Sequence, residues 1–125
     1  MSSSTLPFRS DRRFRVWEFW VSHSMLLIRS AHSEVSPHNV DLVFNGVSFL
    51  SIPWLFEGLT VNQGDDAAHS DFQRMFPGRV HFEIPGHALF VLESGPGTAS
   101  YIAAASLLVD HNDRPPMTRR LNPLE

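Results

Sequence analysis

The stretch FRVWEFWVSHSMLLIRS, residues 14–30, decides the fold class of this chain. Both of its halves are rich in β-branched, aromatic and long apolar side chains, which fit the pleated surface of a sheet. A Ser-His-Ser sequence separates the halves, and serine is common in turns. We therefore predict two antiparallel strands joined by a hairpin whose two-residue tip is His23-Ser24.

The register of this predicted hairpin follows from its charges. A tip at His23-Ser24 sets Glu18 opposite Arg29, an arrangement that cross-strand pairing favours. In an extended strand Ser22 and His23 point to opposite faces, so they do not form a nucleophile–base pair. We interpret Ser-His-Ser as a turn and not as a catalytic site.

The chain beyond this hairpin continues the β pattern. NVDLVF at 39–44 alternates apolar and polar residues, and Asn45-Gly46 predicts a tight hairpin to the return strand VSFLSI at 47–52. Further strands are predicted at 79–84, 87–94 and 99–110, although the Ala-rich part of the last is also compatible with a helix. DAAHSDFQRMF at 66–76 predicts one or two helical turns, with Asp65 or Asp66 as the cap.

These elements predict an all-β domain, a mostly antiparallel sandwich or barrel of about six to eight strands with one short helix. We place it at residues 14–113, between a disordered N-terminal segment at 1–13 and a Pro/Arg-rich C-terminal tail at 114–125. The core residues that we expect are Trp17, Phe19, Leu26, Ile28, Leu42, Phe44, Phe82, Leu89 and Val91.

The composition excludes several classes of protein. The chain has 125 residues and no Cys, so it has neither a disulfide framework nor a Cys-based zinc site. No apolar leader segment precedes residue 14, and no apolar run reaches the 18 residues of a membrane helix. We therefore expect a single cytoplasmic domain that binds no membrane.

The charges are unevenly distributed along the chain. Residues 1–15 carry a net charge of +3 and residues 114–125 a net charge of +2, whereas residues 16–113 carry −8. The basic ends suggest a polyanion binder acting through terminal Arg clusters. Flexible ends lying over an acidic body explain the same pattern. We favour this second reading and expect no nucleic-acid partner.

The strongest metal-ligand pattern is VHFEIPGH, which holds His81, Glu83 and His87. Two histidines and a carboxylate are a known ligand set for zinc or iron. In a strand, however, a Pro85-Gly86 turn sends His87 to the face opposite His81 and Glu83. We therefore expect no metal and no cofactor, and we interpret these residues as surface histidines with a neighbouring acid.

Three segments, VSHSMLLIRS, NVDLVFNGVSFLSIP with EGLTV behind it, and SYIAAASLLVDHND, carry a resemblance. Together they resemble a group of small uncharacterised bacterial proteins from GC-rich bacteria, over roughly residues 14–113. The group has no assigned activity, so the resemblance implies a compact bacterial domain and no catalytic residues.

The aromatic residues suggest a surface for a partner. Phe and Trp account for 13 residues, many for this length, so one exposed apolar face is plausible. We predict a non-catalytic binding or protein-interaction module of the accessory or immunity type, for which self-association remains open. A metal-dependent β-barrel enzyme using His81, Glu83 and His87 is the alternative, and the polyanion binder is a weaker one.

Overall fold

The computed structural model describes residues 6–33, 37–95 and 99–113 of the chain. Within these ranges the chain is mostly antiparallel β-sheet with one short α-helix, as the sequence predicts. The elements in chain order are β1 (Phe8–Trp20), η1 (Val21–His23), β2 (Met25–Ser30), β3 (Asn39–Asn45), β4 (Phe49–Ser51), β5 (Leu55–Gln63), α1 (Asp66–Met75), β6 (Ala88–Glu93), β7 (Ala99–Ala104) and β8 (Ser106–Asn112).

The hairpin at residues 14–30 is confirmed, but its predicted register is wrong. The loop is formed by the short 3₁₀ turn η1 and by Ser24, which has a φ of 52°, and the closing pair is Trp20 with Met25. A β-bulge between Val16 and Glu18 shifts the register again, so that Glu18 lies opposite Leu27. A bulge changes which face the following side chains occupy, and an alternating pattern does not reveal it.

Arg29 takes a different partner from the one expected. Its guanidinium donates to both carboxylate oxygens of Asp41 on β3, at 2.7 and 3.1 Å, and both side chains are fully buried. The ring of Trp17 lies 5.1 Å from the guanidinium carbon. The predicted Glu18–Arg29 pair is therefore replaced by a buried, bidentate ion pair between neighbouring strands.

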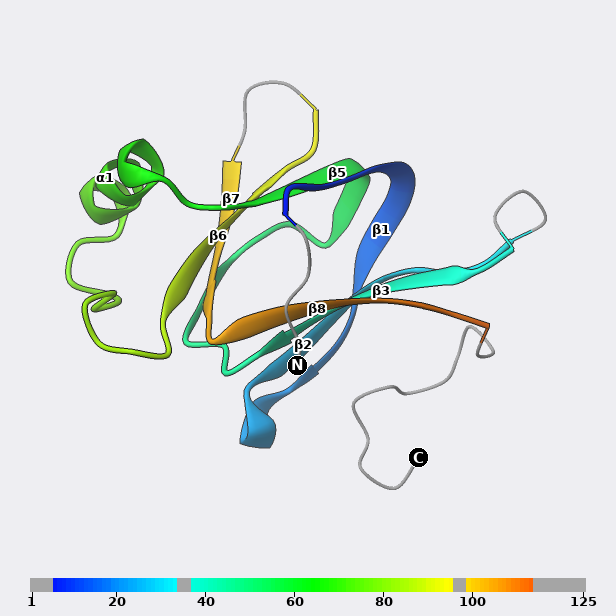
Figure 1. The fold of residues 1–125 in the computed structure, drawn as a ribbon, viewed down its shortest axis with the longest axis horizontal. Helices are drawn as coiled ribbons and strands as arrows, with labels where there is room; N and C mark the ends of the chain where they lie inside the picture. Colours follow the sequence, from blue (N-terminus) through cyan, green and yellow to red (C-terminus); the bar gives the residue numbers. More distant parts are fainter. Residues whose placement is uncertain (1–5, 34–36, 96–98, 114–125) are drawn as a thin grey trace.

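The sheet closes on itself through two bent strand pairs. The strand order is β4-β7-β6-β5-β1-β2-β3-β8, so that β4 and β8 stand at its two ends. These ends meet, because β3 runs on into β4 and β7 runs on into β8, and the first bent strand pairs with the second. Backbone hydrogen bonds from Ala105 to Asn45 and from Ser48 to Ala103, both 2.8 Å, join the two pairs at the bend. In Figure 1, β6 and β7 run steeply while β3 and β8 run nearly horizontally, so the wall turns a corner there.

The tight Asn45-Gly46 hairpin is a wrong prediction. Gly46 does adopt a positive φ of 66°, but β3 pairs with β2 and β8, and β4 pairs with β7. A Cβ on Gly46 would lie 2.8 Å from the Cβ of Ala105, so this glycine also allows the two bent strands to approach each other. The same signal that favours a hairpin turn here marks a barrel corner.

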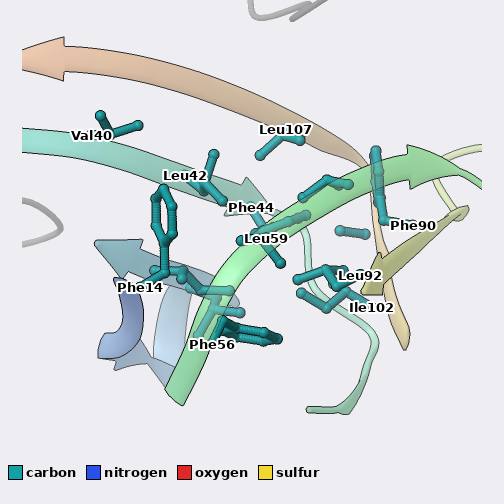
Figure 2. Packing of buried hydrophobic residues seen from close by; sticks show 14 residues of the cluster. Phe14, Val40, Leu42, Phe44, Phe56, Leu59, Phe90, Leu92, Ile102 and Leu107 are labelled. Atoms are coloured by element: carbon teal, nitrogen blue, oxygen red, sulfur yellow. The ribbon is translucent and has the colours of Figure 1, made fainter. Parts of the chain in front are cut away.

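The barrel interior holds the main hydrophobic core. Figure 2 shows side chains from most of the strands converging on it, among them Phe14, Phe44, Phe56 and Phe90. The edge of the Phe44 ring meets Phe90 at a centroid distance of 5.5 Å. The core also contains Leu26, Ile28, Val40, Leu42, Leu59, Val61, Leu92, Ile102, Ala104 and Leu107.

A second cluster lies outside the barrel, where α1 covers β6 and β7 (Figure 1). Phe72 of α1 is fully buried, and its ring meets those of Phe49, Phe82 and Tyr101 at 5.1 to 5.5 Å. The Asp65 carboxylate caps the helix by accepting from the Ala68 N–H at 2.8 Å. At ten residues, α1 is longer than the one or two turns predicted.

Two further predictions need correction. Residues 79–84 form an irregular loop and not a strand. Its apolar residues Val80 and Phe82 pack under α1 and not into a sheet. At the N-terminus β1 begins at Phe8, inside the segment 1–13 expected to be disordered, because Phe8 and Phe14 place apolar rings against the core. The tail at 114–125 lies outside the described residues.

The predicted core is partly correct. Leu26, Ile28, Leu42, Phe44 and Leu89 are buried, whereas Trp17, Phe82 and Val91 are half-buried at the outer clusters. Phe19 is wrong as a core residue, since its side chain is 41% exposed. It lies opposite Leu26 on the inner face of the hairpin, but at a place where the barrel wall is incomplete.

Candidate binding site

The most apolar hollow of those described lies in the wall of the barrel, and we call it the slot. Its volume is about 480 Å³, and eight residues line it, all of them uncharged. The hairpin contributes one side and the segment around β4 the other. The lining residues are Val16, Phe19, Leu26, Leu50, Ser51, Ile52, Pro53 and Trp54.

The slot forms because two neighbouring stretches of chain separate and meet again. The ladder between β5 and β1 ends at the pair Leu55 and Arg15. The stretch that precedes Leu55 and contains β4 is not paired with β1, because β4 pairs with β7 instead. Two backbone hydrogen bonds close the ends of the gap, from Val16 N–H to the Trp54 carbonyl at 2.9 Å and from Val47 N–H to the Ser24 carbonyl at 2.8 Å.

Two large apolar side chains of the lining are exposed, since Trp54 is 78% exposed and Phe19 41%. Leu55, next to Trp54 in the chain, is also 40% exposed. Pro53 has no N–H to donate, and with the following Trp54 it keeps the rim apolar. Scattered apolar residues are normal on a protein surface, but exposed aromatic side chains that line a hollow are typical of a binding site.

The lining determines what the slot can do chemically. It presents one hydroxyl, from Ser51, and no acid, base or cation. Removing an apolar group from water is favourable by roughly 25 cal/mol per Å² of area buried, and nothing in the lining would have to be desolvated at high cost. The slot therefore suits an apolar group and offers no residues for acid–base catalysis.

The Ser-His-Ser turn lies at the tip of the hairpin, as predicted. Contrary to the geometry expected of an extended strand, the Ser22 hydroxyl and His23 Nδ1 do approach within 3.0 Å, because the residues are in a 3₁₀ turn. The His23 ring stacks on Trp20 at a centroid distance of 3.7 Å. Within the described residues His23 has no carboxylate behind it, which a catalytic triad would require.

The three candidate metal ligands lie in the loop before β6. His81 Nδ1 is 3.5 Å from the Glu83 carboxylate, and both side chains are exposed. His87 turns instead to the Ser48 hydroxyl, with its Nδ1 3.1 Å away. In the part of the chain that the structure describes, no three His, Asp or Glu side chains lie close enough together to hold a metal ion. The loop, and not the two faces of a strand, separates these residues.

The N-terminal arginines are divided between internal contacts and solvent. Arg12 donates to the Ser30 hydroxyl and to the carbonyls of Ser30, Ala31 and His38, and burial lowers its pKa. Arg13 pairs with Glu57 at 3.0 Å on the surface. These contacts neutralise or occupy part of the basic cluster that a polyanion would need. The arginines at 114, 119 and 120 lie outside the described residues.

The sequence did not identify the slot itself. Leu50 and Ile52 fall in the predicted return strand at 47–52, and the hydrophobic pattern does not tell a lining residue from a buried one. A signal was present in Pro53-Trp54, since proline cannot take part fully in a ladder and tryptophan is common at interfaces.

No family model, no curated protein and no solved structure matches this chain. In the described residues no helix has the length and apolar character needed to cross a membrane.

Proposed function

We propose that this chain is a non-catalytic interaction module that takes an apolar group of a partner protein into the slot. The observation that carries the proposal is an uncharged hollow of about 480 Å³ whose lining residues Phe19 and Trp54 are exposed. Pockets of this size are in the range that binds ligands. The absence of titratable groups from the lining favours binding over catalysis.

A comparison of three forms of the protein tests this proposal. The wild type, Trp54→Asp and Met75→Asp would be immobilised and exposed to a lysate of the native host. Met75 is 56% exposed on α1 and does not line the slot, so its variant controls for adding a carboxylate to any exposed apolar site. Captured proteins would be identified by mass spectrometry, and their binding to each form measured with purified components by calorimetry.

The expected result is one partner that binds the wild type and Met75→Asp equally and Trp54→Asp at least tenfold more weakly. Equal binding to all three forms would show that the slot is not the site. Elemental analysis of protein purified without a tag addresses the enzyme alternative. About one equivalent of zinc, iron or manganese that is lost in His81→Ala would contradict the non-catalytic proposal.

A further inference from the structure

A second hollow lies between α1 and the outer face of the sheet, and we call it the acidic hollow. Its volume is about 510 Å³, and it shares no residue with the slot. Among the described residues its lining contains the carboxylates of Asp65, Asp71 and Glu93 and no cationic side chain. It therefore differs from the slot in charge as well as in place.

The floor of the acidic hollow is a row of side chains across three strands. Asn62 of β5 lies opposite Val91 of β6, which lies opposite Tyr101 of β7, so the three share one face of the sheet. The ring of Tyr101 packs against Phe72 of α1 and against Phe76, at centroid distances of 5.4 and 6.3 Å. The helix therefore forms a wall beside this floor.

The hydroxyl of Tyr101 indicates that the acidic hollow accommodates a ligand. Tyr101 is only 5% exposed, yet it lines the hollow. Its ring is packed by aromatic neighbours, but in the described part of the chain its hydroxyl has no hydrogen-bond partner. Polar groups that are buried in proteins are nearly always hydrogen-bonded, and a bound ligand would supply the missing partner here.

The carboxylates determine the charge of this ligand. The Asp65 carboxylate caps α1 by accepting from the Ala68 N–H, and Asp71 pairs with Arg74. Glu93 is exposed, and its carboxylate has no partner among the described residues. Even with Arg74 counted, the hollow carries an excess of negative charge, which repels anions and attracts a cation.

The pKa of Tyr101 is consistent with this environment. Burial raises the pKa of Tyr101 above its ordinary value, and the charges of Asp71 and Glu93 raise it further. Arg74 acts in the opposite direction. The hydroxyl is therefore within electrostatic reach of both carboxylates, and it stays protonated at neutral pH, where its oxygen can accept a hydrogen bond.

The cation that suits the acidic hollow is organic and not a metal ion. Within the described residues no three His, Asp or Glu side chains lie close enough together to hold a metal ion. Asp65 and Asp71 are six residues apart, which is about 9 Å along a helix axis. Ala67, Ala68 and Val91 line the same hollow and would contact methylene groups. An ammonium group on an aliphatic chain matches both the charges and these apolar side chains.

We propose that the acidic hollow binds an alkylammonium group, supplied either by a free polyamine or by a lysine side chain of another protein. The ammonium group donates hydrogen bonds to the Tyr101 hydroxyl oxygen and to the Glu93 carboxylate. The aliphatic chain lies against the alanines of α1. Because this site and the slot have no residue in common, the inference does not depend on the proposed function.

Spermidine and the peptide acetyl-Gly-Lys-Gly-amide serve as probes, one for each source of the ammonium group. Each would be titrated at low ionic strength into the labelled full chain, and amide chemical shifts would report the binding. Tyr101→Phe removes the hydroxyl without a change of charge, and Glu93→Gln removes one carboxylate of the hollow. Glu83→Gln is the matched control, because Glu83 is exposed and does not line the hollow.

The expected result is one saturable site, with the largest shifts at residues 62–71, 91–93 and 99–101. Tyr101→Phe and Glu93→Gln should each weaken binding at least about fivefold, because each removes a hydrogen bond to a charged group. Glu83→Gln should bind like the wild type. Binding of spermidine alone would assign the hollow to a free polyamine, and binding of the peptide as well would extend it to lysine side chains.

Three outcomes would overturn the inference. The first is that neither probe gives a saturable change. The second is that Glu83→Gln weakens binding as much as Glu93→Gln, which would indicate general attraction to an acidic protein. The third is unchanged affinity in a folded Tyr101→Phe variant, since the hydroxyl would then take no part. If circular dichroism shows that Tyr101→Phe does not fold, the comparison of Glu93→Gln with Glu83→Gln decides alone, because both side chains are exposed.

Discussion

Phe14 and Phe19 lie on the same strand and on the same inner face, but the structure gives them different energetic roles. Phe14 is fully buried in the barrel, where it lies opposite Phe56, and its ring meets Phe8 edge to face at 6.0 Å. Truncating such a residue to alanine loses transfer free energy and leaves a cavity, at a cost of about 3–5 kcal/mol. A domain of this size has a stability of about 5–15 kcal/mol, so the variant Phe14→Ala is close to unfolding.

Phe19 should cost much less, although the hydrophobic pattern alone predicts the same loss for both residues. Its side chain is 41% exposed, so only about three-fifths of the roughly 1.5–3 kcal/mol for complete burial applies. The slot is already open to solvent, so truncation creates no closed cavity. We expect a loss of about 1–2 kcal/mol for Phe19→Ala.

Urea unfolding of the two variants, followed by circular dichroism, measures this difference. With a slope of about 2 kcal/mol per M, Phe14→Ala should lower the midpoint by about 2 M and Phe19→Ala by less than about 1 M. Equal losses, or a larger loss for Phe19→Ala, would refute the placement of Phe19 at an incomplete part of the wall. Unchanged slopes are needed for the comparison, because a changed slope indicates a different unfolded state or loss of two-state behaviour.

Three further predictions concern the buried ion pair, the corner of the barrel at Gly46 and the side chain of Tyr101 under α1. Asp41→Asn should cost about 3–5 kcal/mol in urea unfolding, because it removes the negative charge of the carboxylate that accepts both hydrogen bonds from the buried Arg29. The double variant Arg29→Met with Asp41→Leu should lose less than Asp41→Asn alone, and a larger loss would contradict this account. Gly46→Ala should destabilise more than Gly78→Ala, since both have positive φ but only the former meets a neighbour, at 2.8 Å. The pKa of Tyr101 lies above its ordinary value of about 10, mainly because of burial and also because of the charges of Asp71 and Glu93, while Arg74 acts in the opposite direction. Its contribution to stability is complete below pH 10 and is lost as the pH rises through the folded-state pKa, so Tyr101→Phe should flatten the alkaline part of the stability profile. This is the only Tyr in a chain without Lys or Cys, so its ultraviolet titration reports the pKa directly, and a midpoint at or below 10 would contradict the burial.

The all-β architecture could be predicted because strand signals and turn signals alternate through most of the sequence. The hairpin at 14–30 illustrates both the strength and the limit of this reasoning. Side-chain types predict that two strands meet near Ser22-His23-Ser24, and they do. The bulge between Val16 and Glu18 is a backbone feature that arises from pairing with β2, so no alternation in the sequence marks it.

The turn signal at Asn45-Gly46 was misinterpreted for a related reason. A glycine with positive φ is required at that point, and the sequence indicates it correctly. Whether the chain then folds back or turns a corner depends on the partner strands β7 and β8, which are more than fifty residues away in sequence. Local patterns do not contain that information.

The slot could not be predicted, because it depends on where ladders end and not on residue type. Leu50 and Ile52 have the same apolar character as the buried residues of neighbouring strands. They line an opening only because β5 leaves β1 at Leu55 while β4 crosses to β7. The sequence gives a sign of this opening in Trp54, an aromatic residue that follows a proline. We predicted an exposed apolar face but not its position.

The most direct test of the binding account is a map of amide chemical-shift changes when the Trp54-dependent partner is added to the labelled protein. The account predicts that the largest changes fall on residues 16–20 and 47–55, on the two sides of the slot, with little change on α1. Changes concentrated on α1 or on the surface around Arg13, with the slot amides unaffected, would contradict the central claim.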